Sequence, residues 1–278
     1  MDDLSWLGEP IDARGLFATE RARLVDYLRT LDDADWQRPV TSRWTVRDVV
    51  AHVLGDDYGR IARDRDGHFG GGGPQTGEDL ASFIHRQNQD WVDATQRISA
   101  RALVDTLELS GAWISQLFLE SDQFAPSLGV SWAGVDPAPR WLDCARELTE
   151  YWVHRQQVRE ATGAQVDTDP TLLGPVLDTF FRALPITLAK QRAVRGSRVR
   201  VTVADIPAAE WTVTATDAGW SLVPGVAGQV VAEVQFDADT AWRMATRAIE
   251  PATTRERARA SGDSSIIGAL CELVAIVR

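Results

Sequence analysis

Residues 44–53 read WTVRDVVAHV, and they mark the beginning of a helix clearly. Thr45 followed three residues later by Asp48 is typical of a capping box, in which each side chain bonds the backbone N–H of the other residue. Val49, Val50 and Val53 predict that one face of the helix is buried. We therefore expect a helix over residues 46–58, with His52 among its apolar residues.

A second decisive stretch is TEYWVH at residues 149–154, within a helix expected over residues 140–161. Glu150 and His154 are four residues apart, so on a helix their side chains lie one turn apart on the same face. This spacing suits two ligands of one metal ion, and His52 on the earlier helix is the natural third. One carboxylate and two imidazoles match a catalytic zinc site with a position open for water or substrate. From the pattern alone, the more common alternative is that each is an ordinary hydrogen-bonded core or surface histidine.

The remaining elements follow from periodicity and from turn residues. Helical spacing of apolar residues predicts further helices over residues 16–31, 79–98 and 99–119. After Pro170 we expect a helix over residues 172–190 that Pro185 kinks or splits. Alternating valines and β-branched residues then predict strands at 198–203, 211–215 and 230–236, followed by helices near 239–244 and over 266–277. The Asp217-Ala218-Gly219 turn favours antiparallel pairing.

This order of elements predicts an α+β protein with two domains. A chain of 278 residues exceeds the usual size of one domain, about 100 to 200 residues. Turn residues gather between Gly163 and Pro170, where the helical pattern gives way to strands. We therefore expect a helical bundle over residues 1–165 and a smaller α/β domain with an antiparallel sheet over residues 166–278.

Composition excludes several classes of function. The net charge of -11 would repel a nucleic-acid backbone or an anionic membrane, so neither is an expected partner. Two cysteines are too few for a disulfide framework or an all-cysteine zinc site, and they suit a reducing compartment. The first residues lack a signal-peptide pattern, and no apolar run approaches the roughly 20 residues that span a membrane. We expect a cytoplasmic protein.

Taken together, residues 44–53 and 150–159 (EYWVHRQQVR) resemble the two metal-binding segments of the mycothiol-dependent maleylpyruvate isomerase family. The resemblance covers nearly the whole chain. It implies a DinB-like antiparallel four-helix bundle followed by a small domain similar to sterol-carrier folds. It also implies that His52, Glu150 and His154 bind a divalent metal, with zinc as the expected ion, although the same ligands can hold nickel, iron or manganese.

The resemblance further implies mycothiol, or another low-molecular-weight thiol, as a cofactor. Metal coordination would make its thiolate available at neutral pH. In the family's reaction the thiolate adds to the cis double bond of an unsaturated diacid, the adduct rotates, and elimination releases the trans product. The expected partners are therefore a small thiol and an anionic or electrophilic substrate, bound by a monomer or homodimer.

Other residues are candidates for the same site. Gln157 stands where relatives often have an acid, so it either orients a metal ligand, cofactor or substrate, or belongs to a solvated helix face. Clamps for substrate carboxylates are expected among the arginines Arg60, Arg63, Arg243 and Arg247. Two alternatives stay open: another thiol-dependent transferase or hydrolase on this scaffold, and a non-enzymatic small-molecule-binding protein.

Overall fold

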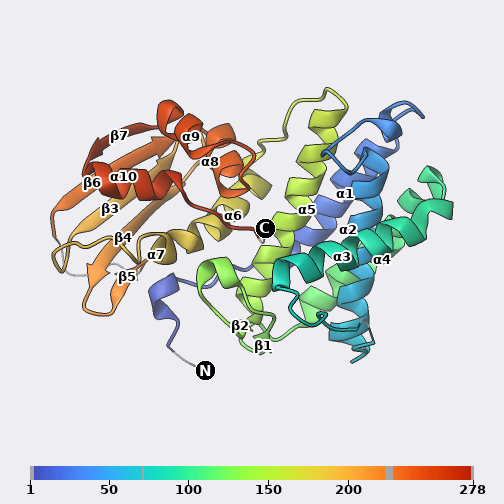
Figure 1. Cartoon of the computed structure of the whole chain (residues 1–278), viewed down its shortest axis with the longest axis horizontal. Helices are drawn as coiled ribbons and strands as arrows, with labels where there is room; N and C mark the ends of the chain where they lie inside the picture. Colours follow the sequence, from blue (N-terminus) through green and yellow to red (C-terminus); the bar gives the residue numbers. More distant parts are fainter. Residues whose placement is uncertain (1–2, 71, 223–227, 277–278) are drawn as a thin grey trace. The chain divides into compact units, whose positions relative to one another are not determined.

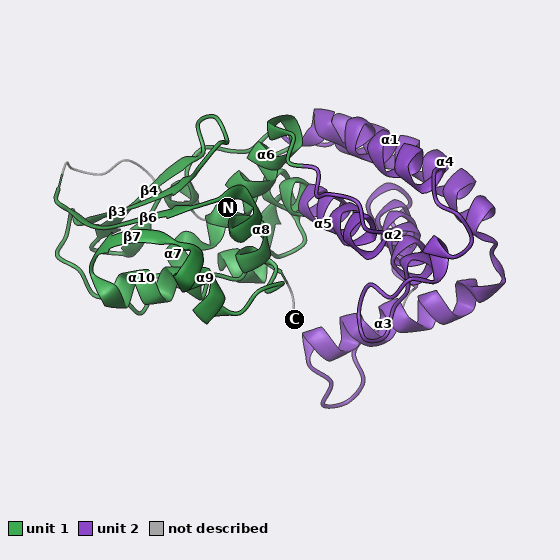
Figure 2. Ribbon diagram, turned by 90° about the horizontal axis from the view of Figure 1, so that it is seen from above, with its two compact units in different colours: residues 1–12, 123–146, 168–277 green, residues 13–122, 147–167, 278 purple. Residues whose placement is uncertain are grey.

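The computed structural model describes residues 3–70, 72–222 and 228–276. The chain forms two compact units, coloured separately in Figure 2. Among the described residues, the helical unit comprises those of 13–122 and 147–167, and the α+β unit comprises those of 3–12, 123–146 and 168–276. Within the described part of the chain, no helix combines the length and apolarity needed to span a membrane. The expected α+β class is confirmed, and a single boundary at residues 165/166 stays a prediction.

The helical unit is built from four complete helices and most of a fifth. These are α1 (Phe17–Leu28), α2 (Val46–Arg60), α3 (Leu80–Ala94), α4 (Ala100–Glu120) and α5 (Arg140–Ala161), which enters this unit at residue 147. Helices α1 and α2 pack against α4, and α3 packs against α2. Figure 1 shows α5 alongside α1 and α2. This places the two helices that were expected to carry metal ligands in one bundle.

Helix α2 begins as the sequence predicts. The Thr45 side chain accepts from the Asp48 N–H, while the Asp48 carboxylate accepts from the Thr45 N–H at 3.0 Å, so the capping box is complete. A capping interaction of this kind stabilises a helix by about 1 kcal/mol. After Arg60 the helix continues as a π-helical turn over Ile61–Arg65.

A buried ionic cluster connects the helices of this unit. Asp57 on α2 is fully buried and accepts from both terminal nitrogens of Arg21, at 2.7 and 2.8 Å. It also accepts from the hydroxyls of Ser110 on α4, at 2.5 Å, and of Tyr151 on α5, at 2.6 Å. Gly111 makes room for this cluster, since a Cβ there would lie 2.3 Å from Cγ of Arg21. The hydrogen bond from Tyr151 to Asp57 connects α5 directly to α2.

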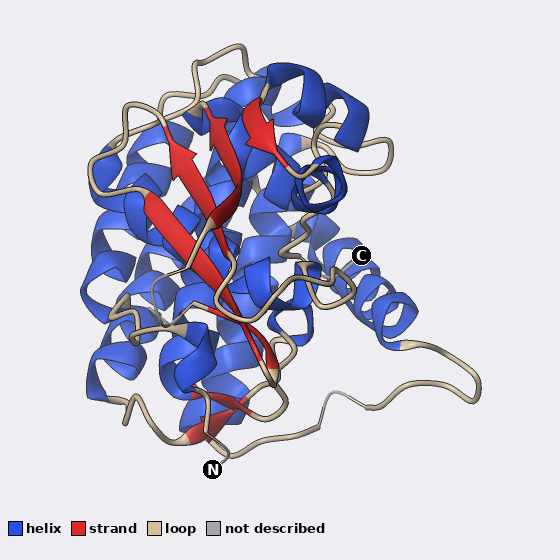
Figure 3. Cartoon of the chain, turned by 90° about the vertical axis from the view of Figure 1, so that its left-hand side faces the viewer, coloured by secondary structure: helices blue, strands red, loops and turns tan. Residues whose placement is uncertain are grey.

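The α+β unit contains a five-stranded sheet in the order β5-β4-β3-β6-β7. The strands of the chain are red in Figure 3. Its strands are β3 (Arg198–Val203), β4 (Glu210–Thr216), β5 (Gly219–Ser221), β6 (Val230–Phe236) and β7 (Arg259–Gly262). The helices of this unit are α6 (Pro170–Phe180), α7 (Leu184–Thr187), α8 (Ala238–Ala245), α9 (Pro251–Arg257) and α10 (Ser264–Cys271). Helix α10 packs on β6 and β7, and α7 packs on β5. A separate two-stranded pairing joins β1 (Pro126–Ser127) to β2 (Ala138–Pro139).

The sheet differs from the expectation in one pairing. Strands β3 and β4 are antiparallel, as are β4 with β5 and β6 with β7, but β3 and β6 run parallel. The β4–β5 hairpin lies between β3 and β6 in sequence, so no short turn determines the direction of that pairing. The predicted turn at residues 217–219 does form the β4–β5 hairpin.

Several element boundaries also differ. The helix expected over residues 172–190 is divided into α6 and α7 by a 3-10 turn at Phe181–Ala183, in agreement with the predicted effect of Pro185. The final helix ends at Cys271, and residue 277 of its expected range lies outside the described residues. Helix α9 and strand β7 were not predicted. Strand β7 is exposed throughout, so it carries no apolar alternation by which a strand is recognised.

Candidate metal centre

His52 lies on α2, near the middle of the helix, and only 7% of the residue is exposed. Two aromatic rings flank its imidazole: the Trp44 ring lies 5.1 Å away between centroids, and the His154 ring lies 4.8 Å away and perpendicular to it. The indole N–H of Trp44 donates to Gln89 on α3 at 2.9 Å. Trp44 is thus held in place and restricts the orientation of the His52 ring.

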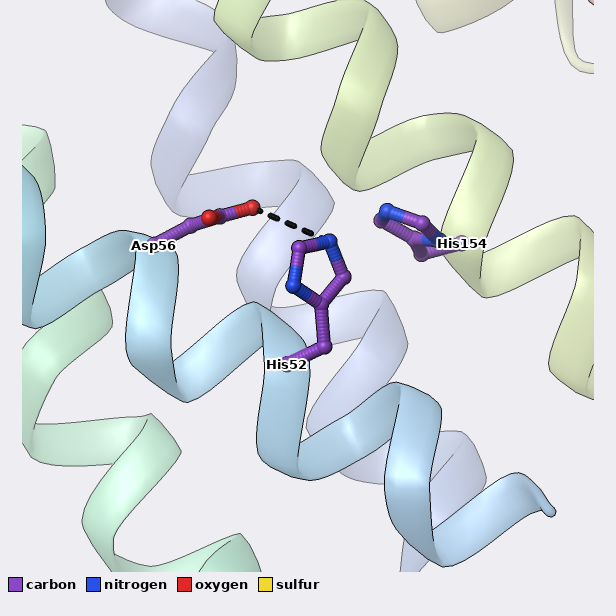
Figure 4. Close-up of side chains that lie close together, drawn as sticks. All are labelled: His52, Asp56 and His154. Carbon is purple, nitrogen blue, oxygen red and sulfur yellow. Dashed lines mark ion pairs between the residues drawn. The ribbon is translucent and has the colours of Figure 1, made fainter. Parts of the chain in front are cut away.

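His154 lies on α5 and approaches His52 from the opposite helix (Figure 4). Its Nε2 atom is buried and has no hydrogen-bond partner. A buried polar nitrogen without a partner is costly, and such an atom is an expected feature of a site that receives a ligand. The nearest carboxylate is that of Glu150, with Oε2 3.9 Å from Nε2, beyond hydrogen-bonding distance.

A second carboxylate, which the sequence analysis did not single out, also belongs to this cluster. Asp56 lies one turn after His52 on α2, and its Oδ2 is 3.4 Å from Nε2 of His52. Figure 4 shows the His52 ring between the Asp56 carboxylate and the His154 ring. Single ligand atoms of His52, Asp56 and His154 all lie within 4.8 Å of one another. The sequence did carry a signal for Asp56: it follows His52 by four residues, the same spacing that separates Glu150 from His154.

Both imidazoles are neutral at pH 7. Burial lowers the pKa of His52 to about 4, against the opposing effects of Glu150 and Glu147. Burial also lowers the pKa of His154, and the neighbouring His52 lowers it further. Because a metal ion competes with a proton for the imidazole lone pair, neutral rings are ready to bind one. The contact between His52 and Asp56 would be an ion pair only if His52 were protonated.

Gln157 lies one turn after His154 on α5 and contacts its other ring nitrogen. The distance from His154 Nδ1 to Gln157 Oε1 is 2.9 Å. An amide oxygen can only accept, so Nδ1 carries the proton and Nε2 keeps its lone pair directed at the cluster. This is the arrangement that orients a metal-binding histidine. The residues present therefore fit a divalent metal.

Arg60 is buried within the same unit. Its guanidinium donates to Glu147 at 2.7 Å and to Asp64 at 3.2 Å, and 3% of the residue is exposed. Glu147 in turn acts electrostatically on His52. Arg60 thus contributes positive charge near the cluster, and its role as a substrate clamp stays a prediction.

Arg243 lies in the α+β unit, on α8. Its Nε donates to Asp239 at 2.7 Å, and its guanidinium lies over the Trp242 ring, 4.4 Å from the centroid. The side chain is 19% exposed. Its assignment to substrate binding also stays a prediction.

Two buried histidines with carboxylates beside them, supplied by facing helices, form the kind of side-chain cluster with which helical bundles can bind a metal ion in their core. The family model described as the mycothiol maleylpyruvate isomerase N-terminal domain matches residues 17–159, half of the chain. The chain belongs to this family. None of the curated proteins matches it significantly.

Two crystal structures share the fold. The mycothiol-dependent maleylpyruvate isomerase is 17% identical, with a TM-score of 0.52, and a mutant of that enzyme is 15% identical, with a TM-score of 0.51. In each case 86% of this chain and 90% of the other chain are covered. The expected DinB-like arrangement of the bundle is confirmed.

Proposed function

We propose that this chain is a metal- and mycothiol-dependent isomerase that converts a cis unsaturated diacid of the maleylpyruvate type into its trans isomer. The observation that carries this proposal is the buried Nε2 atom of His154, which has no hydrogen-bond partner and lies beside a second neutral histidine. Membership of the isomerase family supports the class of reaction.

His52, Glu150 and His154 would hold the ion, and zinc suits two imidazoles and a carboxylate. Bound there, the ion would lower the pKa of a thiol at the open position, so that the thiolate forms at neutral pH. Residues of the chain keep the two imidazoles in the form that binds a metal. Gln157 keeps the proton of His154 on Nδ1, and burial keeps both imidazoles neutral.

The nucleophile would come from an external thiol. Cys144 and Cys271 are both buried, and both belong to the α+β unit. Mycothiol would supply reversible addition to the double bond. Addition converts the double bond into a single bond that can rotate, and elimination then regenerates the thiol. The protein would contribute substrate orientation and exclusion of water.

The carboxylates of a diacid require cationic partners. We assign this role to Arg60 and Arg243. Arg60 already shares its charge with Glu147 and Asp64, so substrate would have to exchange with one of these contacts. Replacement of either arginine by Met should raise KM for a diacid more than it lowers kcat, and an unchanged KM would remove that arginine from the site.

The test combines metal content with turnover. Elemental analysis of the purified chain should give about one divalent ion per chain, and the His52→Ala variant should give almost none. The parent should isomerise maleylpyruvate only when mycothiol is added, and His154→Ala should abolish that turnover. Turnover that persists in His154→Ala, or a parent that never binds metal, would refute the proposal.

Another thiol-dependent transferase or hydrolase is the second candidate. The family resemblance implies an acid at position 157, and Gln157 contacts His154 there without supplying a negative charge. A family scaffold determines the substrate less strictly than it determines the fold. Conjugation of mycothiol to a panel of electrophiles, with no isomerisation of maleylpyruvate, would identify this activity.

A non-enzymatic binding protein is the third candidate, and one feature of the α+β unit favours it. A cavity of about 380 Å³ there is lined by Asp178, Arg182, Trp211 and neighbouring residues. The indole N–H of Trp211 donates to Asp178 at 2.8 Å, so both side chains are held in place. Binding of a small molecule that persists after metal removal, without any thiol-dependent activity, would support this alternative.

A further inference from the structure

The two helices that face each other at the cluster carry the same ligand pattern. On α2, His52 is followed four residues later by Asp56, and on α5, Glu150 is followed four residues later by His154. Each helix therefore places one imidazole and one carboxylate on a common face. Extending the metal site proposed above, we propose that Asp56 is a further metal ligand, so that two imidazoles and two carboxylates hold the ion and a fifth position stays open for the thiol.

The distances favour Asp56 at least as strongly as Glu150. Ligand atoms about 2.0 to 2.2 Å from a four- or five-coordinate ion lie roughly 3.0 to 3.6 Å apart. The separation between Asp56 Oδ2 and His52 Nε2 is 3.4 Å, whereas that between Glu150 Oε2 and His154 Nε2 is 3.9 Å. The ligand atoms that lie within 4.8 Å of one another come from His52, Asp56 and His154, and Glu150 is outside this group.

The neighbouring acid on α2 has a different role, which isolates Asp56 as the candidate. Asp57 is fully buried, and its carboxylate accepts four hydrogen bonds from Arg21, Ser110 and Tyr151. Asp56 points instead toward His52 (Figure 4), and its side chain is 31% exposed. Of these two consecutive acids, only Asp56 is therefore placed to bind an ion.

Charge balance supports two carboxylates. Before a thiolate binds, two neutral imidazoles with Glu150 alone would leave one positive charge on a bound divalent ion. The side chains of His52 and His154 are only 9% and 13% exposed, so an uncompensated charge between them would be costly. A second carboxylate from Asp56 makes the centre neutral.

The test measures metal binding directly on the full-length, metal-free chain. Zinc affinity is determined by competition with a chromophoric chelator for the parent, Asp56→Asn, Glu150→Gln and the control Asp105→Asn. Asp105 suits the control because it also lies on a bundle helix and its side chain is 61% exposed. Since even residues behind the metal ligands contribute 10- to 100-fold to affinity, Asp56→Asn should weaken binding by at least about tenfold.

The visible spectrum of bound cobalt(II) provides a second readout, because it would not change if the role of Asp56 were purely structural. Loss of a carboxylate ligand should alter the position and intensity of the visible absorption in Asp56→Asn, while Asp105→Asn should keep the parent spectrum. Because Asp56 is partly exposed, its metal-free variant should retain the parent melting temperature within about 2 °C. Asp56→Ser serves as a second variant that also removes the carboxylate.

The outcomes separate this inference from the proposed function. If the parent binds zinc and both Asp56 variants keep its affinity within twofold and its cobalt spectrum, Asp56 is not a ligand and the three-residue site stands. If the parent binds neither zinc nor cobalt, the proposed metal site and this inference are both overturned. Weaker binding with an altered cobalt spectrum in both Asp56 variants would confirm the four-residue site.

Discussion

The hydrogen bond between Gln157 and His154 should influence metal affinity measurably. Its Nδ1–Oε1 distance of 2.9 Å is that of an ordinary hydrogen bond between neutral groups, which contributes about 0.5 to 1.5 kcal/mol. If His154 lost its preference for the Nδ1–H form, this hydrogen-bond energy would correspond to a loss of metal affinity of roughly 2- to 13-fold. Loss of ring orientation adds to this effect, so Gln157→Ala should weaken zinc binding by about 10- to 100-fold.

Substitution by Glu provides the opposite perturbation. A charged acceptor forms a hydrogen bond roughly twice as strong, so Gln157→Glu should bind zinc more tightly than the parent. The exposed Gln165, in the same unit, offers Gln165→Ala as the matched control, which should leave affinity unchanged.

Two assays test this prediction. Chelator competition gives the zinc affinity of each variant. Long-range ¹H–¹⁵N correlation spectra of the metal-free chain report which nitrogen of His154 carries the proton. We expect the Nδ1–H form in the parent and in Gln157→Glu, and a mixture of the two neutral forms in Gln157→Ala. An Nε2–H form in the parent, or equal affinity in Gln157→Ala and the parent, would refute the reasoning.

Three further predictions concern stability and charge. Asp57→Ala leaves the buried Arg21 without its carboxylate, so it should destabilise the chain by about 3 to 5 kcal/mol in denaturant unfolding, and a loss below 1 kcal/mol would contradict this. A chelator should lower the melting temperature of the metal-loaded parent but not of His52→Ala, since an ion present at 100 times its Kd stabilises by about 2.7 kcal/mol. Hydrogen bonds from Arg86 lower the pKa of Glu78 to about 2, so this pair should stabilise the fold above pH 4.5 and lose that effect as pH falls through 2. An NMR titration of Glu78 should show this midpoint, and Arg86→Met should return it toward 4.5.

Local chemistry allowed much of the bundle to be predicted from sequence. The capping box at Thr45 fixed the beginning of α2, and the helix expected over residues 140–161 is α5 residue for residue. The three predicted strands were also found in place: β3 and β6 have the predicted bounds, and β4 extends one residue further at each end. Hydrogen bonds and side-chain spacing within one segment determine these features, so no distant contact was needed.

Non-local packing decided the elements that were missed. The parallel pairing of β3 with β6 joins strands separated by a hairpin, and β7 is an exposed edge strand whose residues show no alternation. Helix α4 continues through Gly111, and the Arg21 side chain lies against that glycine, where a larger residue would clash with it. Such close approaches depend on a partner far away in sequence.

The sequence by itself determined which residues of each helix can share a ligand, because i, i+4 spacing is a property of one helix. It therefore identified Glu150 with His154, and His52 as a residue on a buried face. Only the tertiary structure decided that the two imidazoles meet at 4.8 Å, that Asp56 joins them, and that Gln157 holds the Nδ1 proton of His154. The distance between α2 and α5 depends on the packing of side chains from several helices, and no single segment encodes it.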